Sequence, residues 1–465
     1  MRRILGVLVL ALLIAGLWEL SRPASHFLRS QASVNLYDPN PAHLWNRLHS
    51  VLFIREDLPD TARLPDALDP PLWLNSKYLL EKPSHERVLR ILDEFLQSHG
   101  EKLIQDPVKR AILTRDLWAV FDWSVEREAE RPGEPEYQKE KRELQVRLAE
   151  ILRRLSLTSA EIRSLPSNYA LAVASGQFAK EYDPAHRDRP FLPPDLFEPN
   201  SSWVEIYSEA GEFGSSQIAE SHAQAFSRST FFVFMHLPAG RKATFEYIRS
   251  LWDFPQPWLS RPDDPRHEQV IVNPHLPQFP AGTQFALVRQ LILFDNQGTL
   301  LGTPITESVQ IRAYRSLPAV SEESLHNEAS ALADSGQDFF EIRLSRPQLF
   351  SNSAGGLRAT APKEKEFAIF NSFGADKIAP SIRLDRYTPI LEQCAVCHHS
   401  PGINSVNSRR HLLKPYWLNH DYPESAPAPT TANQNSWWVD ETGVSAKQRR
   451  FDWGVLNGYW KSGSE

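Results

Sequence analysis

The sequence is poor in cysteine, methionine and glycine, and it has no excess of basic charge. Two cysteines in 465 residues exclude a disulfide framework as the source of stability. The 51 lysines and arginines are outnumbered by 57 aspartates and glutamates, which gives a formal net charge of −6. Because nucleic-acid binding requires a strongly basic surface, we expect no nucleic-acid partner. With 36 prolines against 20 glycines, the chain favours extended connections over an all-helical bundle.

Several motifs of nucleotide-binding proteins and hydrolases are also missing. The chain contains no G-x-G-x-x-G, no phosphate-binding P-loop, no G-x-S-x-G and no H-E-x-x-H. Dinucleotide-binding, serine-hydrolase and zinc-protease functions therefore have no support in the sequence. The length of 465 residues nevertheless corresponds to about three domains, which is enough to bury substantial cores.

The N-terminal segment has the pattern of an export signal. Met1-Arg2-Arg3 is followed by an apolar run from Ile4 to Trp18, which is the charged and then hydrophobic order of a secretory signal. No small-x-small cleavage motif follows, so an uncleaved anchor is the second interpretation, although the run is shorter than the ~20 residues of a comfortable membrane span. With both arginines on the cytoplasmic side, we expect the body in the bacterial periplasm or on the outer face of the cytoplasmic membrane.

The hydrophobic pattern predicts an α+β protein. Apolar residues recur at helical spacing over residues 84–99, 106–121 and 144–155, and residues 158–161 have the spacing of a capping box. A cluster of prolines from 184 to 199 then marks a boundary, after which β-favouring segments alternate with long proline-rich loops. The expected strands lie at 231–234, 285–294, 309–313 and 339–344, with a turn at 295–298.

These patterns predict four regions along the chain. Residues 1–22 form the signal or membrane anchor, residues 23–182 a helical region, and residues 183–378 a strand-rich region. Residues 379–465 form a C-terminal region that contains both cysteines.

One short segment of this C-terminal region carries a chemical motif. Cys394-Ala395-Val396-Cys397-His398 has the order C-x-x-C-H, which is the pattern of c-type haem attachment. Two thiols three residues apart on a helix can each reach a haem vinyl group, and the adjacent imidazole then lies under the iron. At this site the chain resembles a c-type cytochrome. The resemblance implies one covalent haem c per chain, with Cys394 and Cys397 as anchors and His398 as the proximal iron ligand.

The second axial ligand of the iron is left open. In the common small cytochromes c a methionine downstream of the motif supplies it, but the methionines here, Met1 and Met235, both precede the motif. His411 and His420 follow the motif and would give bis-histidine ligation, which generally has a lower potential than His/Met ligation. Met235 is a further candidate, although its apolar segment is also typical of a core methionine. A vacant sixth position is another alternative, which would permit ligand binding.

Other uses of the two cysteines are alternatives to haem attachment. A structural zinc site would combine Cys394, Cys397 and nearby histidines, but a second regularly spaced ligand pair is missing. A disulfide-exchange site would need a βαβ context. Neither use explains a histidine directly after the second cysteine. We therefore expect an exported haem protein that exchanges electrons with a redox partner protein or a membrane electron-transport component. A haem oxidoreductase with an open distal site, acting on a small substrate or peroxide, and a non-catalytic binding module are the alternatives.

Overall fold

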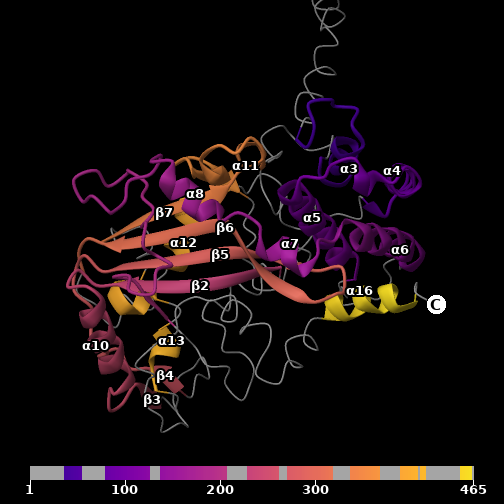
Figure 1. Cartoon of the computed structure of the whole chain (residues 1–465). Helices are drawn as coiled ribbons and strands as arrows, with labels where there is room; N and C mark the ends of the chain where they lie inside the picture. Colours follow the sequence, from indigo (N-terminus) through magenta and orange to yellow (C-terminus); the bar gives the residue numbers. More distant parts are fainter. Residues whose placement is uncertain are drawn as a thin grey trace, which may run out of the picture.

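Figure 1 shows a computed structural model of the chain. The described residues are 36–54, 79–125, 137–206, 228–260, 270–317, 336–366, 388–398, 400–406, 409–414 and 451–462. The predicted export signal or anchor at residues 1–22 lies outside them. Within these ranges, no helix is long and apolar enough to cross a membrane.

Helices of the N-terminal half gather at one end of the sheet, together with the last helix of the chain (Figure 1). They are α3 (Leu44–Phe53), α4 (Ser84–Gln97), α5 (Pro107–Val125), α6 (Gln138–Leu155) and α16 (Phe451–Ser462). Their apolar side chains form one core, in which Trp45 and Trp118 are fully buried and Trp460 nearly so. The helices predicted at 84–99, 106–121 and 144–155 are confirmed, with ends shifted by a few residues.

Two helix starts follow directly from the local sequence. Asp106 precedes α5, and its Oδ1 accepts hydrogen bonds from the backbone N–H groups of Val108 at 2.8 Å and Lys109 at 3.0 Å. These bonds satisfy donors that the first helical turn leaves without a partner. Thr158 and Glu161 form the predicted capping box, which starts α7 (Ser159–Arg163).

The strands form an antiparallel sheet in the order β1-β2-β5-β6-β7-β8. They are β1 (Val204–Glu205), β2 (Ser229–His236), β5 (Gln284–Phe294), β6 (Leu300–Tyr314), β7 (Gln337–Leu344) and β8 (Leu357–Ala359). All four expected strands are confirmed. The predicted turn joins β5 to β6: Asp295 Oδ1 accepts from the backbone N–H of Gln297 at 2.9 Å and of Thr299 at 2.8 Å, and Gly298 has a φ of 83°. With these helices and an antiparallel sheet, the protein is α+β.

The proline-rich part of the middle region differs from the expectation of loop alone. It contains the short hairpin β3 (Trp258–Ser260) and β4 (Val270–Val272). An unexpected helix, α10 (Arg241–Trp252), connects it to β2. The remaining short elements are η5 (Gly100–Lys102), α8 (Asn168–Ala174), α11 (Arg346–Phe350), η7 (Ala354–Gly356), β9 (Lys365–Glu366), β10 (Thr388–Pro389), α12 (Ile390–Cys397), η9 (Gly402–Ser405) and α13 (Arg409–Leu412).

The two faces of the sheet pack against different layers. In Figure 1, α8 and α11 lie above the strands, and α10 and α13 lie below them. The core on the α8 side contains Phe232, Phe234 and Ile311. The core on the α10 side contains Met235 and Tyr314, together with apolar residues of η9 and α13. The sheet therefore places the segment that follows the C-x-x-C-H motif on its α10 side.

Candidate functional site

Helix α12 carries the C-x-x-C-H motif and extends its hydrogen-bonding pattern to His398. The backbone N–H of His398 donates to the carbonyl oxygen of Cys394 at 3.0 Å, which is a helical contact between residues four apart. Residues at this spacing lie on one face of a helix. Cys394 and His398 are both half-buried. The start of the helix is fixed by Ile390, whose side chain is buried and whose N–H donates to the Glu364 carbonyl at 3.0 Å.

A backbone carbonyl holds the imidazole ring of His398. Its Nδ1 lies 2.8 Å from the carbonyl oxygen of Ser405. Because a carbonyl oxygen can only accept, Nδ1 must carry the ring proton in this hydrogen bond, and the lone pair of a neutral imidazole is then on Nε2. A metal-binding histidine is commonly oriented in the same way, with its other ring nitrogen donating to a carbonyl. The ring of His398 therefore has the tautomer that ligation through Nε2 requires.

The loop that supplies this carbonyl is fixed by polar contacts to the rest of the fold. Ser405 Oγ donates to the Gly402 carbonyl at 2.8 Å and lies 2.5 Å from the buried hydroxyl of Tyr314. The Ile403 N–H donates to Gln278 Oε1 at 2.9 Å. Gly402 has a φ of 55°, which favours glycine, and a Cβ atom there would meet Gln278 Oε1 at 2.1 Å and displace this side chain. The loop conformation that places the Ser405 carbonyl is thus specified by its own sequence and by β6.

Arg312 of β6 also contacts this loop. Its Nη1 donates to the Ser405 carbonyl oxygen at 2.9 Å and to the Tyr314 hydroxyl at 3.0 Å. The guanidinium carbon lies 5.6 Å from the ring centroid of Phe285 and 5.8 Å from that of Tyr314, distances typical of cation–π contacts. Burial raises the pKa of the Tyr314 hydroxyl, so it stays protonated as a hydrogen-bond donor. The motif, the loop and β6 form one connected polar unit.

Strand β7 contacts the same segment. Gln337 Nε2 donates to the carbonyl oxygens of His398 at 3.0 Å and Ser400 at 3.3 Å. Gln337 pairs with Tyr314 in the sheet register, so neighbouring strands hold both ends of the loop.

The other candidate iron ligands are only partly described. Met235 is fully buried on β2, in the same apolar cluster as Tyr314 and Ile403. This position matches the ordinary core-methionine interpretation. The side chains of Cys397 and His411 lie outside the described part of the chain, as does all of His420. The structure thus brings Cys394, His398 and the Ser405 carbonyl together.

The described donors fit a covalently attached haem. A thiol and a correctly tautomeric imidazole lie one turn apart on α12 and are half-buried, as attachment through sulfur and ligation through nitrogen would require. Among the described side chains, no group of three or more His, Cys, Asp and Glu residues could hold a metal ion by itself.

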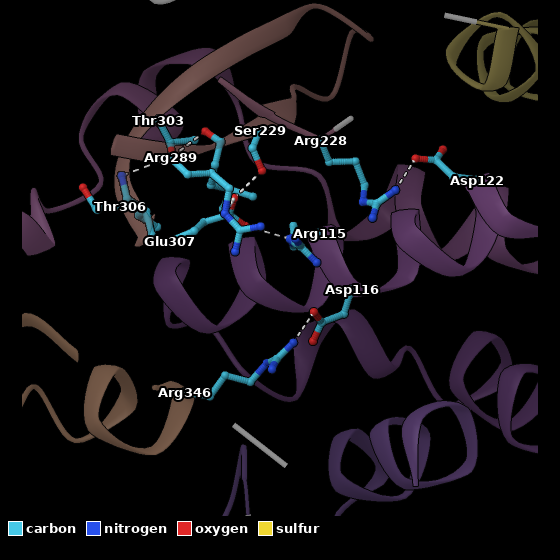
Figure 2. Close-up of polar contacts among 12 residues, drawn as sticks. Arg115, Asp116, Asp122, Arg228, Ser229, Arg289, Thr303, Thr306, Glu307 and Arg346 are labelled. Carbon is cyan, nitrogen blue, oxygen red and sulfur yellow. Dashed lines mark hydrogen bonds and ion pairs between the residues drawn. The ribbon is translucent and has the colours of Figure 1, made fainter. Parts of the chain in front are cut away.

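A second polar cluster, which the sequence did not predict, lies between α5 and the sheet. Figure 2 shows Arg115 pointing from α5 toward Glu307 of β6. Arg115 Nε donates to Glu307 Oε1 at 2.9 Å, and their side chains are 1% and 0% exposed. The same carboxylate accepts from the hydroxyl of Ser229 and lies 3.5 Å from Arg289 Nε. Glu307 is the extra residue of a β-bulge, since Ser308 pairs with Arg289 and Thr306 with the next residue of β5.

The cluster continues through the next residue of α5. Arg346 Nη2 donates to Asp116 Oδ1 at 2.5 Å, and the hydroxyl of Tyr37 donates to Asp116 Oδ2 at 3.2 Å. His49 stacks edge-on against Tyr37. Burial, together with the charge of Arg346, lowers the pKa of His49 to about 3. Arg228 and Asp122 add a further ion pair at 2.8 Å (Figure 2). These contacts join α3, α5, α11 and the sheet, and they give the cluster a structural role.

Comparisons with protein-family models, with curated proteins and with solved structures gave no significant match to this chain.

Proposed function

We propose that the protein is an exported c-type haem protein that transfers electrons to or from a periplasmic or membrane redox partner. One haem per chain would be attached through Cys394 and Cys397, with His398 as the proximal ligand. The observation that carries the proposal is the C-x-x-C-H order on α12, combined with the 2.8 Å hydrogen bond from His398 Nδ1 to the Ser405 carbonyl.

Each residue of the motif has a defined task. Cys394 and Cys397 would each hold the haem through a thioether bond to the carbon of one vinyl group, with the thiol hydrogen taken up by the other vinyl carbon. His398 would hold the iron through Nε2, while the Ser405 carbonyl keeps Nδ1 protonated and the ring oriented. The bound iron supplies a one-electron couple.

The contacts around His398 favour electron transfer as the function of the haem site. The carbonyl of Ser405, the hydroxyl of Tyr314 and the amide of Gln337 hold the ligand and its loop by hydrogen bonds of 2.5 to 3.0 Å. A ligand fixed by such hydrogen bonds changes its geometry little between two oxidation states, and small reorganisation speeds electron transfer.

The proposal is tested by comparing His398→Ala with His399→Ala in protein from an exporting host that has haem-attachment machinery. The neighbouring histidine is a matched control, since the resemblance gives it no role on the proximal face. We expect His398→Ala to lose the native absorption spectrum and redox wave, and His399→Ala to keep both. An unchanged midpoint potential in His398→Ala would overturn the proposal.

Carbon monoxide separates electron transfer from the oxidoreductase alternative. A protein ligand held firmly at the sixth position excludes the gas from the reduced iron. We expect the reduced wild-type spectrum to stay unchanged under carbon monoxide. A new carbon monoxide complex would instead indicate an open distal site and an enzyme.

A further inference from the structure

Arg312 and His398 donate to the same acceptor. The Ser405 carbonyl oxygen accepts from His398 Nδ1 at 2.8 Å and from Arg312 Nη1 at 2.9 Å. Arg312 comes from β6, which is 93 residues away from Ser405 in the sequence. The motif itself therefore gives no indication of this contact.

A positive charge beside this carbonyl oxygen weakens it as a hydrogen-bond acceptor for the imidazole. A strong acceptor at Nδ1 draws the proton away from the ring and raises the basicity of the ligating nitrogen. Arg312 withdraws electron density from the same oxygen through a charge-assisted hydrogen bond, which is roughly twice as strong as a neutral one. The oxygen is then a weaker acceptor for His398. A less basic imidazole donates less charge to a metal and favours its lower oxidation state.

We propose that Arg312 is a positioning residue that raises the reduction potential of the iron held by His398, an inference that rests on the proposed function. It acts through the Ser405 carbonyl, to which it donates. Its place is fixed by the Tyr314 hydroxyl and by the aromatic rings of Phe285 and Tyr314.

Among the described residues, no carboxylate forms an ion pair with Arg312. Its positive charge therefore acts on the Ser405 carbonyl without being neutralised. Arg315, three residues further along the chain, differs in this respect: its Nε lies 3.1 Å from Asp338 Oδ1. Asp338 lies opposite Ala313 in the sheet register, and Gln337 lies opposite Tyr314. Because successive residues of a strand point to opposite faces, Asp338, the partner of Arg315, lies on the other face of the sheet from Gln337 and Tyr314. Arg315→Met therefore removes one positive charge directly after β6 without changing the acceptor of His398.

The test is the midpoint potential of haem-loaded Arg312→Met, Arg312→Gln and Arg315→Met, measured by spectroelectrochemical titration. At the wild-type midpoint, where oxidised and reduced protein are equal, we expect Arg312→Met to shift the ratio about tenfold toward the oxidised form. For a one-electron couple this corresponds to a potential lower by about 59 mV. Arg312→Gln, which keeps a neutral donor, should shift the ratio less and in the same direction, and Arg315→Met should leave it unchanged. Arg312→Gln keeps the test available if Arg312→Met does not fold.

A second readout follows the hydrogen bond itself and does not require haem. In the chain with both cysteines replaced by alanine, the proton on His398 Nδ1 is observed by nuclear magnetic resonance. Its resonance should move downfield in Arg312→Met, because the bond to Ser405 strengthens. Protein that binds no haem would refute the proposed function. Haem-loaded Arg312→Met with the wild-type potential would refute the role of Arg312 and leave the proposed function standing.

Discussion

Replacement of Glu307 should destabilise the protein far more than replacement of a surface glutamate. Its side chain is 0% exposed and lies against Arg115 at 2.9 Å and Arg289 at 3.5 Å. Glu307→Gln keeps the shape but leaves two buried guanidinium groups facing a neutral amide. Loss of one partner of a buried ion pair costs about 3–5 kcal/mol, so we expect a loss of this size in the free energy of unfolding.

Urea unfolding followed by tryptophan fluorescence measures this loss, with Glu94→Gln as the matched control. Glu94 pairs with Arg47 at 2.6 Å, but the two side chains are 45% and 38% exposed, and exposed pairs contribute about 1 kcal/mol or less. In a double-mutant cycle with Arg115→Met, the two losses should fall short of additivity by about 2–3 kcal/mol, because each removes the same contact. A Glu307→Gln loss no larger than that of Glu94→Gln, or additive losses in the cycle, would refute this reasoning.

Two further predictions concern buried rings. The unfolded chain protonates His49 near its ordinary pKa of 6.5, whereas the folded protein binds that proton only near pH 3, so stability falls as the pH decreases below 6.5. By this linkage His49 should cost about 2 kcal/mol of stability at pH 5, and His49→Phe should remove that part of the pH dependence in urea titrations at pH 7 and pH 5. Tyr314→Phe removes the hydroxyl that contacts Ser405 at 2.5 Å and should lower the free energy of unfolding by about 1–2 kcal/mol. An unchanged urea midpoint would show that this bond contributes nothing.

The parts of the fold that the sequence predicted are those with strong local signals. Helix α5 has Asp106 as a cap before an apolar segment, and the β5–β6 hairpin has an Asp295 turn between two apolar runs. Helix α10 lacks such a signal. It follows Gly240, which has a φ of 86° and no side chain to cap the helix. Arg241 and the lysine after it place positive charge at the positive end of the helix dipole, where acidic residues are favoured.

The candidate site shows the same division between local and distant information. The order of Cys394, Cys397 and His398 is contiguous in the chain and could be read directly. The acceptor of the His398 proton could not, because it is a backbone carbonyl, and any residue type carries one. The Arg115–Glu307 pair is separated by 192 residues. A glutamate within a strand normally indicates a solvent-facing position, and only the tertiary packing of α5 on the bulge of β6 makes Glu307 buried.

The most direct test of the central claim is an absorption spectrum of the full chain, produced in an exporting host with haem-attachment machinery. The protein is first extracted with acidified solvent, which removes haem that is not covalently bound, and is then reduced with dithionite in pyridine. We expect a c-type α-band that survives extraction in the wild type and is absent when Cys394 and Cys397 are replaced by alanine. A colourless wild-type protein that carries zinc or two free thiols would contradict the assignment of this chain as a c-type haem protein.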